Sequence, residues 1–214
     1  MWTLFKREFE DIWFYLLAAI LLVGGPIAMT ELATAKHPGI GDEVLVGFLS
    51  GYVLLCILLL VVGANRMVFD RANGISTFFA GHLTTRGRVF IVRLLLGVMF
   101  AALFYIPLGY WFIWRFLRLL ALTPITPSED ILIRGLGGTM FFLFLFLMGC
   151  YNLGLRMGLS NRRLLYILGS LCLGVILLSF VVLKGFGFEA TVILLILNAA
   201  MIYSTWRDYF AIAL

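Results

Sequence analysis

Residues 44–64 read VLVGFLSGYVLLCILLLVVGA, a run without a charged side chain. About 20 apolar residues in a helix cross a hydrocarbon core about 30 Å thick, so this stretch predicts a transmembrane helix. Five further runs are long and predominantly apolar, and they cover residues 12–29, 89–114, 135–155, 165–183 and 190–206. The sequence therefore predicts six membrane spans.

The composition requires lipid as the main solvent of this chain. Hydrophobic residues make up 63% of it and charged residues only 13%, whereas soluble domains carry about 25% charged residues. The runs are continuous rather than alternating, which favours helices over a barrel. Acidic Glu8, Glu10 and Asp11 precede the first run, in the place where a signal peptide carries basic residues. We expect a single all-α transmembrane domain over residues 1–214.

The basic residues are distributed unevenly between the predicted loops. With the amino terminus inside, eleven of the 16 Lys and Arg residues fall on inner segments and five on outer ones. This asymmetry follows the positive-inside rule and predicts that both termini are cytoplasmic. The net charge of +5 is thus explained by topology, and we expect no nucleic-acid partner.

The first eleven residues have an amphipathic pattern. Trp2, Phe5, Phe9 and Trp13 recur at helical spacing, and charged residues occupy the other side. Such a pattern is typical of a helix that lies in the lipid headgroup plane, so we predict an interfacial helix over residues 1–11 with membrane lipid as its partner. The alternative is that these residues are the start of the first span.

The chemistry of a self-contained enzyme is missing from the sequence. His37 and His82 are the only histidines, and they are predicted on opposite sides of the membrane, so we expect no metal site. No G-x-x-x-x-G-K-[ST] loop is present to hold a nucleotide. Arg93 is the one charged residue within a run, where we expect it to snorkel to the cytoplasmic face. We therefore predict that the chain binds no cofactor and is not an enzyme by itself.

Small residues recur four apart within the runs, in the pairs Gly47/Gly51, Gly154/Gly158 and Ser170/Gly174. Each pair places two small residues on one helix face, where another helix backbone can approach closely. We favour packing within the chain over a dedicated dimer seam.

The second outer connection carries helix signals on both sides. The third helix is predicted to continue past Trp114, because Leu117 and Leu120 extend its apolar face. Thr126-Pro127-Ser128-Glu129 has the form of a capping box, which predicts that the fourth helix begins near Pro127.

The longest inner segment, residues 65–88, has the most specific pattern in the chain. Asn73-Gly74 indicates a turn. The residues Ile75, Phe78, Phe79 and Leu83 then form one apolar face of a short helix, before the basic turn at Arg86. A short helix with exposed aromatic side chains, tethered between two spans, is suited to bind in a groove of a soluble partner.

This segment resembles the signature of the ABC-type 2 permeases, the membrane subunits of many ABC exporters. The residues that carry the resemblance are Asp70-Arg71, Gly74, Ile75 with Phe78-Phe79, Thr84-Thr85-Arg86, and Arg93. The amino-terminal helix and the six spans with cytoplasmic termini fit the same family in outline.

The resemblance implies that residues 65–88 contain a coupling helix. Its docking residues would be Asp70, Arg71, Gly74, Ile75, Phe78, Phe79, Leu83 and Arg86. It further implies an ATP-binding cassette ATPase as cytoplasmic partner, ATP bound on that partner, and pairing with a second permease copy or a paralogue. Transport would be export across a bacterial or archaeal plasma membrane.

Two alternatives follow from the residues themselves. The scarcity of polar residues in the spans is also compatible with a non-transporting scaffold subunit of a membrane complex. A membrane-embedded lipid-processing enzyme would have to use Asp70, Arg71 and His82, with no second acid or metal cluster beside them.

Overall fold

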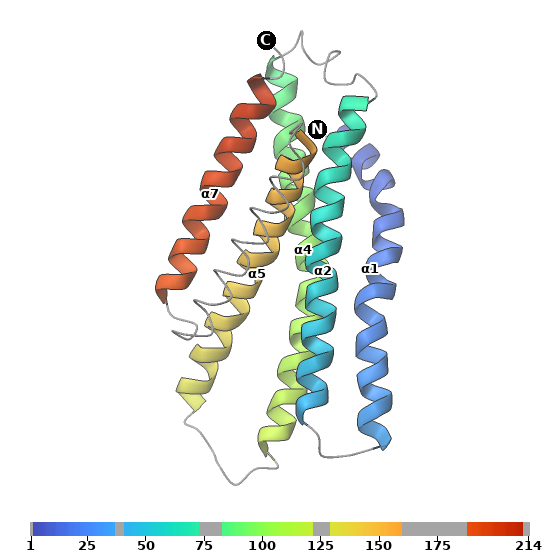
Figure 1. The fold of residues 1–214 in the computed structure, drawn as a ribbon, viewed down its shortest axis with the longest axis vertical. Coiled ribbons are helices and arrows are strands. Elements are labelled where there is room, and N and C mark those ends of the chain that lie inside the picture. The colour runs from blue at the N-terminus through green and yellow to red at the C-terminus, as the bar shows by residue number, and fades with distance from the viewer. Residues whose placement is uncertain (1, 37–40, 73–82, 122–128, 160–187, 212–214) are drawn as a thin grey trace.

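The computed structural model describes residues 2–36, 41–72, 83–121, 129–159 and 188–211, which are helical throughout (Figure 1). The helices are α1 (Trp2–Lys36), α2 (Gly41–Ala72), α4 (Leu83–Ala121), α5 (Glu129–Leu159) and α7 (Phe188–Ala211). The predicted fifth span, 165–183, and the Ser170/Gly174 pair lie outside these ranges.

All five described helices are long and apolar enough to cross a membrane. Their apolar portions are Tyr15–Leu32, Val44–Asn65, Gly87–Arg118, Gly135–Leu159 and Glu189–Phe210. These portions overlap five of the six predicted spans, so the chain is an integral membrane protein whose described residues are all helical.

The helices extend well beyond the predicted spans. The 39 residues of α4 measure about 58 Å at about 1.5 Å per residue, nearly twice a hydrocarbon core of about 30 Å. The predicted loop over residues 65–88 is correspondingly too long, because α2 continues to Ala72 and α4 begins at Leu83. The predicted continuation of the third helix past Trp114 is confirmed, since α4 ends at Ala121.

Helix ends gather at two opposite ends of the bundle (Figure 1). The end drawn uppermost, here called the upper end, holds the starts of α1 and α4 and the last residues of α2, α5 and α7. The lower end holds the opposite termini of α1, α2, α4 and α5, whereas α7 begins part of the way toward that end. Consequently α5 finishes at the upper end, and α7 begins well below it (Figure 1).

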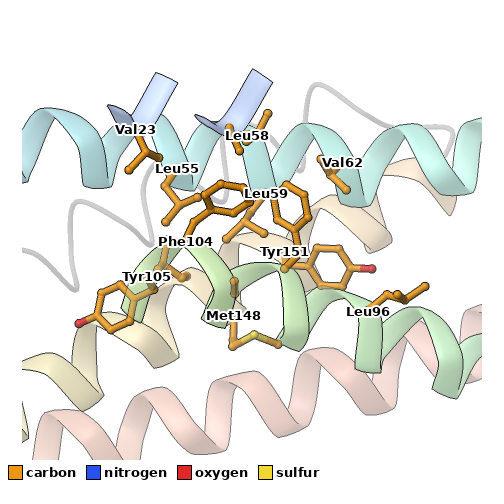
Figure 2. Packing of buried hydrophobic residues seen from close by; sticks show 14 of the residues in the cluster. Val23, Leu55, Leu58, Leu59, Val62, Leu96, Phe104, Tyr105, Met148 and Tyr151 are labelled. Atoms are coloured by element: carbon orange, nitrogen blue, oxygen red, sulfur yellow. The ribbon is translucent and has the colours of Figure 1, made fainter. Parts of the chain in front are cut away.

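The centre of the bundle lies between α2, α4 and α5. Leu55, Leu59 and Val62 of α2 face Phe104 of α4 and Tyr151 of α5 (Figure 2). These side chains are at most 8% exposed. Helix α2 makes its most extensive contact with α5, while α7 packs chiefly on α5. Helix α5 is therefore shared between the central packing and α7.

The outward faces of the helices are apolar as well. Leu21 and Met29 of α1 are 75% and 73% exposed, and Ile106 of α4 and Tyr203 of α7 are similarly open. Water would make such a surface unfavourable, whereas lipid tails solvate it without cost. This surface is what an integral membrane protein presents to the bilayer.

Glycine allows α2 and α5 to cross at backbone distance. A Cβ atom on Gly63 would lie 2.6 Å from the Tyr151 carbonyl oxygen, and one on Gly158 would lie 2.5 Å from the Ala64 carbonyl oxygen. On Gly154 it would collide with the carbonyl oxygen of Leu60. Since Gly47 packs on Thr30 of α1 and Gly51 on Leu108 of α4 in the same chain, the preference for packing within the chain is confirmed for both described pairs.

Candidate functional site

Four of the residues predicted to dock an ATPase lie on helix ends at the upper end. Asp70 and Arg71 belong to the last turn of α2, and Leu83 and Arg86 belong to the first turn of α4. Because α2 and α4 are neighbours in the bundle, their ends place these four backbone positions on one side of the molecule (Figure 1). Gly74, Ile75, Phe78 and Phe79 lie outside the described residues, and the short helix predicted to hold them stays a prediction.

The predicted interfacial residues lie at the start of α1. Trp2, Phe5 and Phe9 belong to its first turns, and Trp13 is 62% exposed. The helix continues unbroken across residues 11 and 12, where the predicted interfacial helix ends and the first span begins. The helical character of residues 2–11 is confirmed, and their position along the membrane surface stays a prediction.

Arg93 is buried in the bundle, and the expectation that it snorkels to the surface is wrong. The residue is 3% exposed, and its Nη1 lies 3.4 Å from the sulfur of Met67 on α2. The apolar portion of α4 begins at Gly87, six residues before Arg93. The side chain is directed into the bundle against α2 rather than along α4 toward that boundary.

Tyr151 of α5 completes this junction. Its hydroxyl donates a hydrogen bond of 2.8 Å to the backbone carbonyl oxygen of Arg93. Its ring lies directly against Gly97, one turn further along α4, where a Cβ atom would overlap the ring. We call Met67, Arg93, Gly97 and Tyr151 the Arg93 node. It joins α2, α4 and α5 at one place.

Aromatic side chains extend the contact around the node to α7. Phe90, one turn before Arg93 and 1% exposed, packs edge-on against Trp206, with ring centroids 5.2 Å apart. Its ring also lies 5.8 Å from that of Tyr209. Aromatic pairs at such distances stabilise helix contacts beyond the area they bury. The upper parts of α4 and α7 are thereby held together.

A second buried polar group joins α5 to α7. Asn198 donates its amide Nδ2 to the carbonyl oxygens of Leu145 and Leu194, both at 3.0 Å. Its Oδ1 accepts a 3.0 Å hydrogen bond from Asn152, which is 2% exposed. This chain of donors fixes both amide orientations. It leaves Oδ1 of Asn152 buried without a hydrogen bond in the described part of the chain.

An ion pair closes the lower end between α1 and α4. Glu31 accepts hydrogen bonds from Arg115 on both carboxylate oxygens, one of them at 2.8 Å from Nε, and from the Trp111 indole at 2.7 Å. Such a bidentate pair fixes the geometry of both partners. The guanidinium groups of Arg115 and Arg118 also lie over the Trp114 ring, at 5.5 and 5.0 Å.

The asparagine pair was not predicted from the sequence, because only ionisable groups within the spans were considered there. Asn152 and Asn198 stand in the predicted spans 135–155 and 190–206, and uncharged polar residues in membrane helices commonly bond across to a neighbour. That rule would have predicted an interhelical hydrogen bond for each residue, but it would not have identified them as partners of each other. Among the described residues, no group of three or more His, Cys, Asp or Glu side chains could hold a metal ion.

Comparisons with protein-family models, with curated proteins and with solved structures found no match to this chain. Its function is therefore inferred from the sequence pattern and from the geometry described above.

Proposed function

We propose that this chain is the transmembrane permease subunit of an ABC exporter, driven by a separate cytoplasmic ATPase that docks on residues 65–88. The observation that carries the proposal is the pattern from Asp70-Arg71 through Phe78-Phe79 to Arg93, which resembles the coupling segment of the ABC-type 2 permeases. ATP would be bound and hydrolysed on the partner.

The arrangement of the helix ends supports this proposal. The starts of α1 and α4 and the ends of α2, α5 and α7 share the upper end (Figure 1). These ends border the segments that the charge asymmetry predicts to be cytoplasmic. Helix α5 finishes at the upper end and α7 begins well below it, which supports a further span over residues 165–183. An upper end facing the cytoplasm would give an ATPase a continuous surface on which to bind.

Direct capture of the partner tests the proposal. The chain, tagged at its amino terminus, is extracted gently from native membranes and its stoichiometric partners are identified by mass spectrometry. We expect an ATPase with a nucleotide-binding loop, because the chain itself has none. The double variant Phe78→Asp/Phe79→Asp should lose that partner, since charged side chains cannot enter an apolar groove without losing hydration.

The matched control is Phe78→Leu/Phe79→Leu, which keeps the apolar character and should retain most of the ATPase. Both variants must elute as monodisperse protein, so that loss of the partner is not loss of fold. Retention of the ATPase by the aspartate variant would show that the coupling assignment is wrong. A stable complex that lacks an ATPase would favour the scaffold, and lipid turnover by the purified chain would favour the enzyme.

A further inference from the structure

The Arg93 node lies on both helices that carry the proposed docking segment. Met67 precedes residue 73 by six residues along α2, and Arg93 follows residue 82 by eleven residues along α4. At about 1.5 Å per residue, the two helices are joined about 9 Å and about 16 Å from the segment. A force applied between residues 73 and 82 therefore meets a fixed junction shortly after it enters either helix.

The same junction includes α5, which does not border the segment. Tyr151 is 1% exposed, and its ring fills the space that Gly97 leaves on α4. Its hydroxyl meets the Arg93 carbonyl oxygen at 2.8 Å. A close-packed ring with a directional hydrogen bond at its tip resists both sliding and rotation of the two helices. The contact therefore ties α5 to the pair that carries the segment.

We infer that Arg93 and Tyr151 are positioning residues for coupling: they make the upper parts of α2, α4 and α5 move as one body when an ATPase acts on residues 73–82. The inference rests on the proposed function and adds the place where motion passes from the docking segment into the bundle. Energetic coupling of this kind needs an element that both sites can bias. The node supplies that element, because it joins the segment's two helices to the central helix α5.

The chain contains a matched pair of tyrosines for the test. Tyr151→Phe deletes the hydroxyl that α5 donates to α4 at the node, and it keeps the ring on Gly97. Tyr105→Phe deletes a hydroxyl that α4 donates to α5, since Tyr105 bonds the Met140 carbonyl oxygen at 2.7 Å. Both changes remove one tyrosine hydroxyl between the same two helices, but only Tyr151 belongs to the node.

Two readouts are measured on both variants. Amide hydrogen exchange of the purified chain reports opening, and we expect Tyr151→Phe to speed exchange about twofold to tenfold over residues 65–72 and 86–93 together. The captured complex, in lipid nanodiscs, reports coupling through its ATP hydrolysis rate relative to the isolated ATPase. Tyr151→Phe should reduce the difference in ATP hydrolysis rate between the complex and the isolated ATPase by about fivefold or more while the ATPase stays bound. Tyr105→Phe should leave both readouts at the wild-type level.

If the two variants behave equally in either readout, the inference is overturned. Equal effects would mean that losing any hydrogen bond between α4 and α5 produces the change, and equal absence of an effect would mean that the node does not produce it. Faster exchange confined to α4 would also overturn it, since α2 and α4 would not be opening together. The proposed function fails in a different way, when no ATPase is captured. The coupling role then falls with it, and the exchange measurement still shows whether the node holds the three helices together.

Discussion

Replacing Gly154 by alanine probes the closest helix crossing in the described bundle. A Cβ atom at this position would collide with the Leu60 carbonyl oxygen and would lie 3.1 Å from the Ala64 amide nitrogen. Both are backbone atoms of α2, so no side chain can rotate away to make room. The helices must separate, and we expect Gly154→Ala to lower the free energy of unfolding.

The magnitude follows from two opposing effects. Inserting a methyl group into a close-packed core costs about 1–3 kcal/mol. Gly138 lies on the same helix, and no described atom lies within 4 Å of the place that an alanine methyl group would occupy there, so Gly138→Ala gains helix propensity of up to about 1 kcal/mol without overlap. Gly154→Ala gains the same propensity, so the two variants should differ by the overlap cost alone, about 1–3 kcal/mol. At about 2–4 °C per kcal/mol, their melting temperatures should differ by roughly 2–12 °C.

The assay is thermal unfolding of both variants in the same detergent, followed by size-exclusion chromatography with fluorescence detection. Gly138→Ala should melt at or above the wild-type temperature, and Gly154→Ala below it. If Gly154→Ala melts as high as Gly138→Ala, the backbone contact between α2 and α5 is absent and the crossing is wrong.

Two further predictions concern the asparagine pair and the direction of the helices. Asn198→Leu should lower the free energy of unfolding by about 0.6–2 kcal/mol in the same thermal assay. The double variant Asn152→Leu/Asn198→Leu should lower it by less than the sum of the single changes, because it leaves no amide unpaired. Strictly additive losses would contradict the pairing. The direction of α4 is tested by single cysteines in a chain whose native cysteines are replaced by alanine. Arg118→Cys should react with a membrane-impermeant maleimide on intact cells and Arg88→Cys only after permeabilisation, since both positions are exposed near opposite ends of α4. Labelling of both from one side would refute the spanning of α4.

Hydropathy predicted where the chain meets lipid more reliably than where the helices end. The run 44–64 lies within α2, which continues to Ala72 through Arg66, Asp70 and Arg71. Charged residues end an apolar run but do not end a helix, because the hydrogen bonds of a helix run between backbone groups and do not require apolar side chains. The capping residues predicted a helix start near Pro127; α5 is described from Glu129, and the capping residues before it lie outside the described ranges.

The polar junctions could not be predicted because they depend on the rotation of one helix relative to another. Arg93 was expected to reach water from the end of a short span, and the longer α4 places it against Met67 instead. Asn152 and Asn198 are 46 residues apart, and nothing local in the sequence links one amide to the other. The glycine pairs were more informative, since a small face on a membrane helix indicates a close neighbour wherever that neighbour lies in the sequence.

The position of α5 has a consequence for how the protein is made. Ribosomes deliver α1, α2 and α4 to the membrane before residues 129–159 exist, so Gly63 and Gly97 wait without the α5 backbone and the Tyr151 ring that later pack on them. Arg93 does not have to wait in the same way, because Met67, which its side chain contacts, lies on α2. The arrival of α5 fills the space beside the two glycines, and it also creates the surface on which α7 docks.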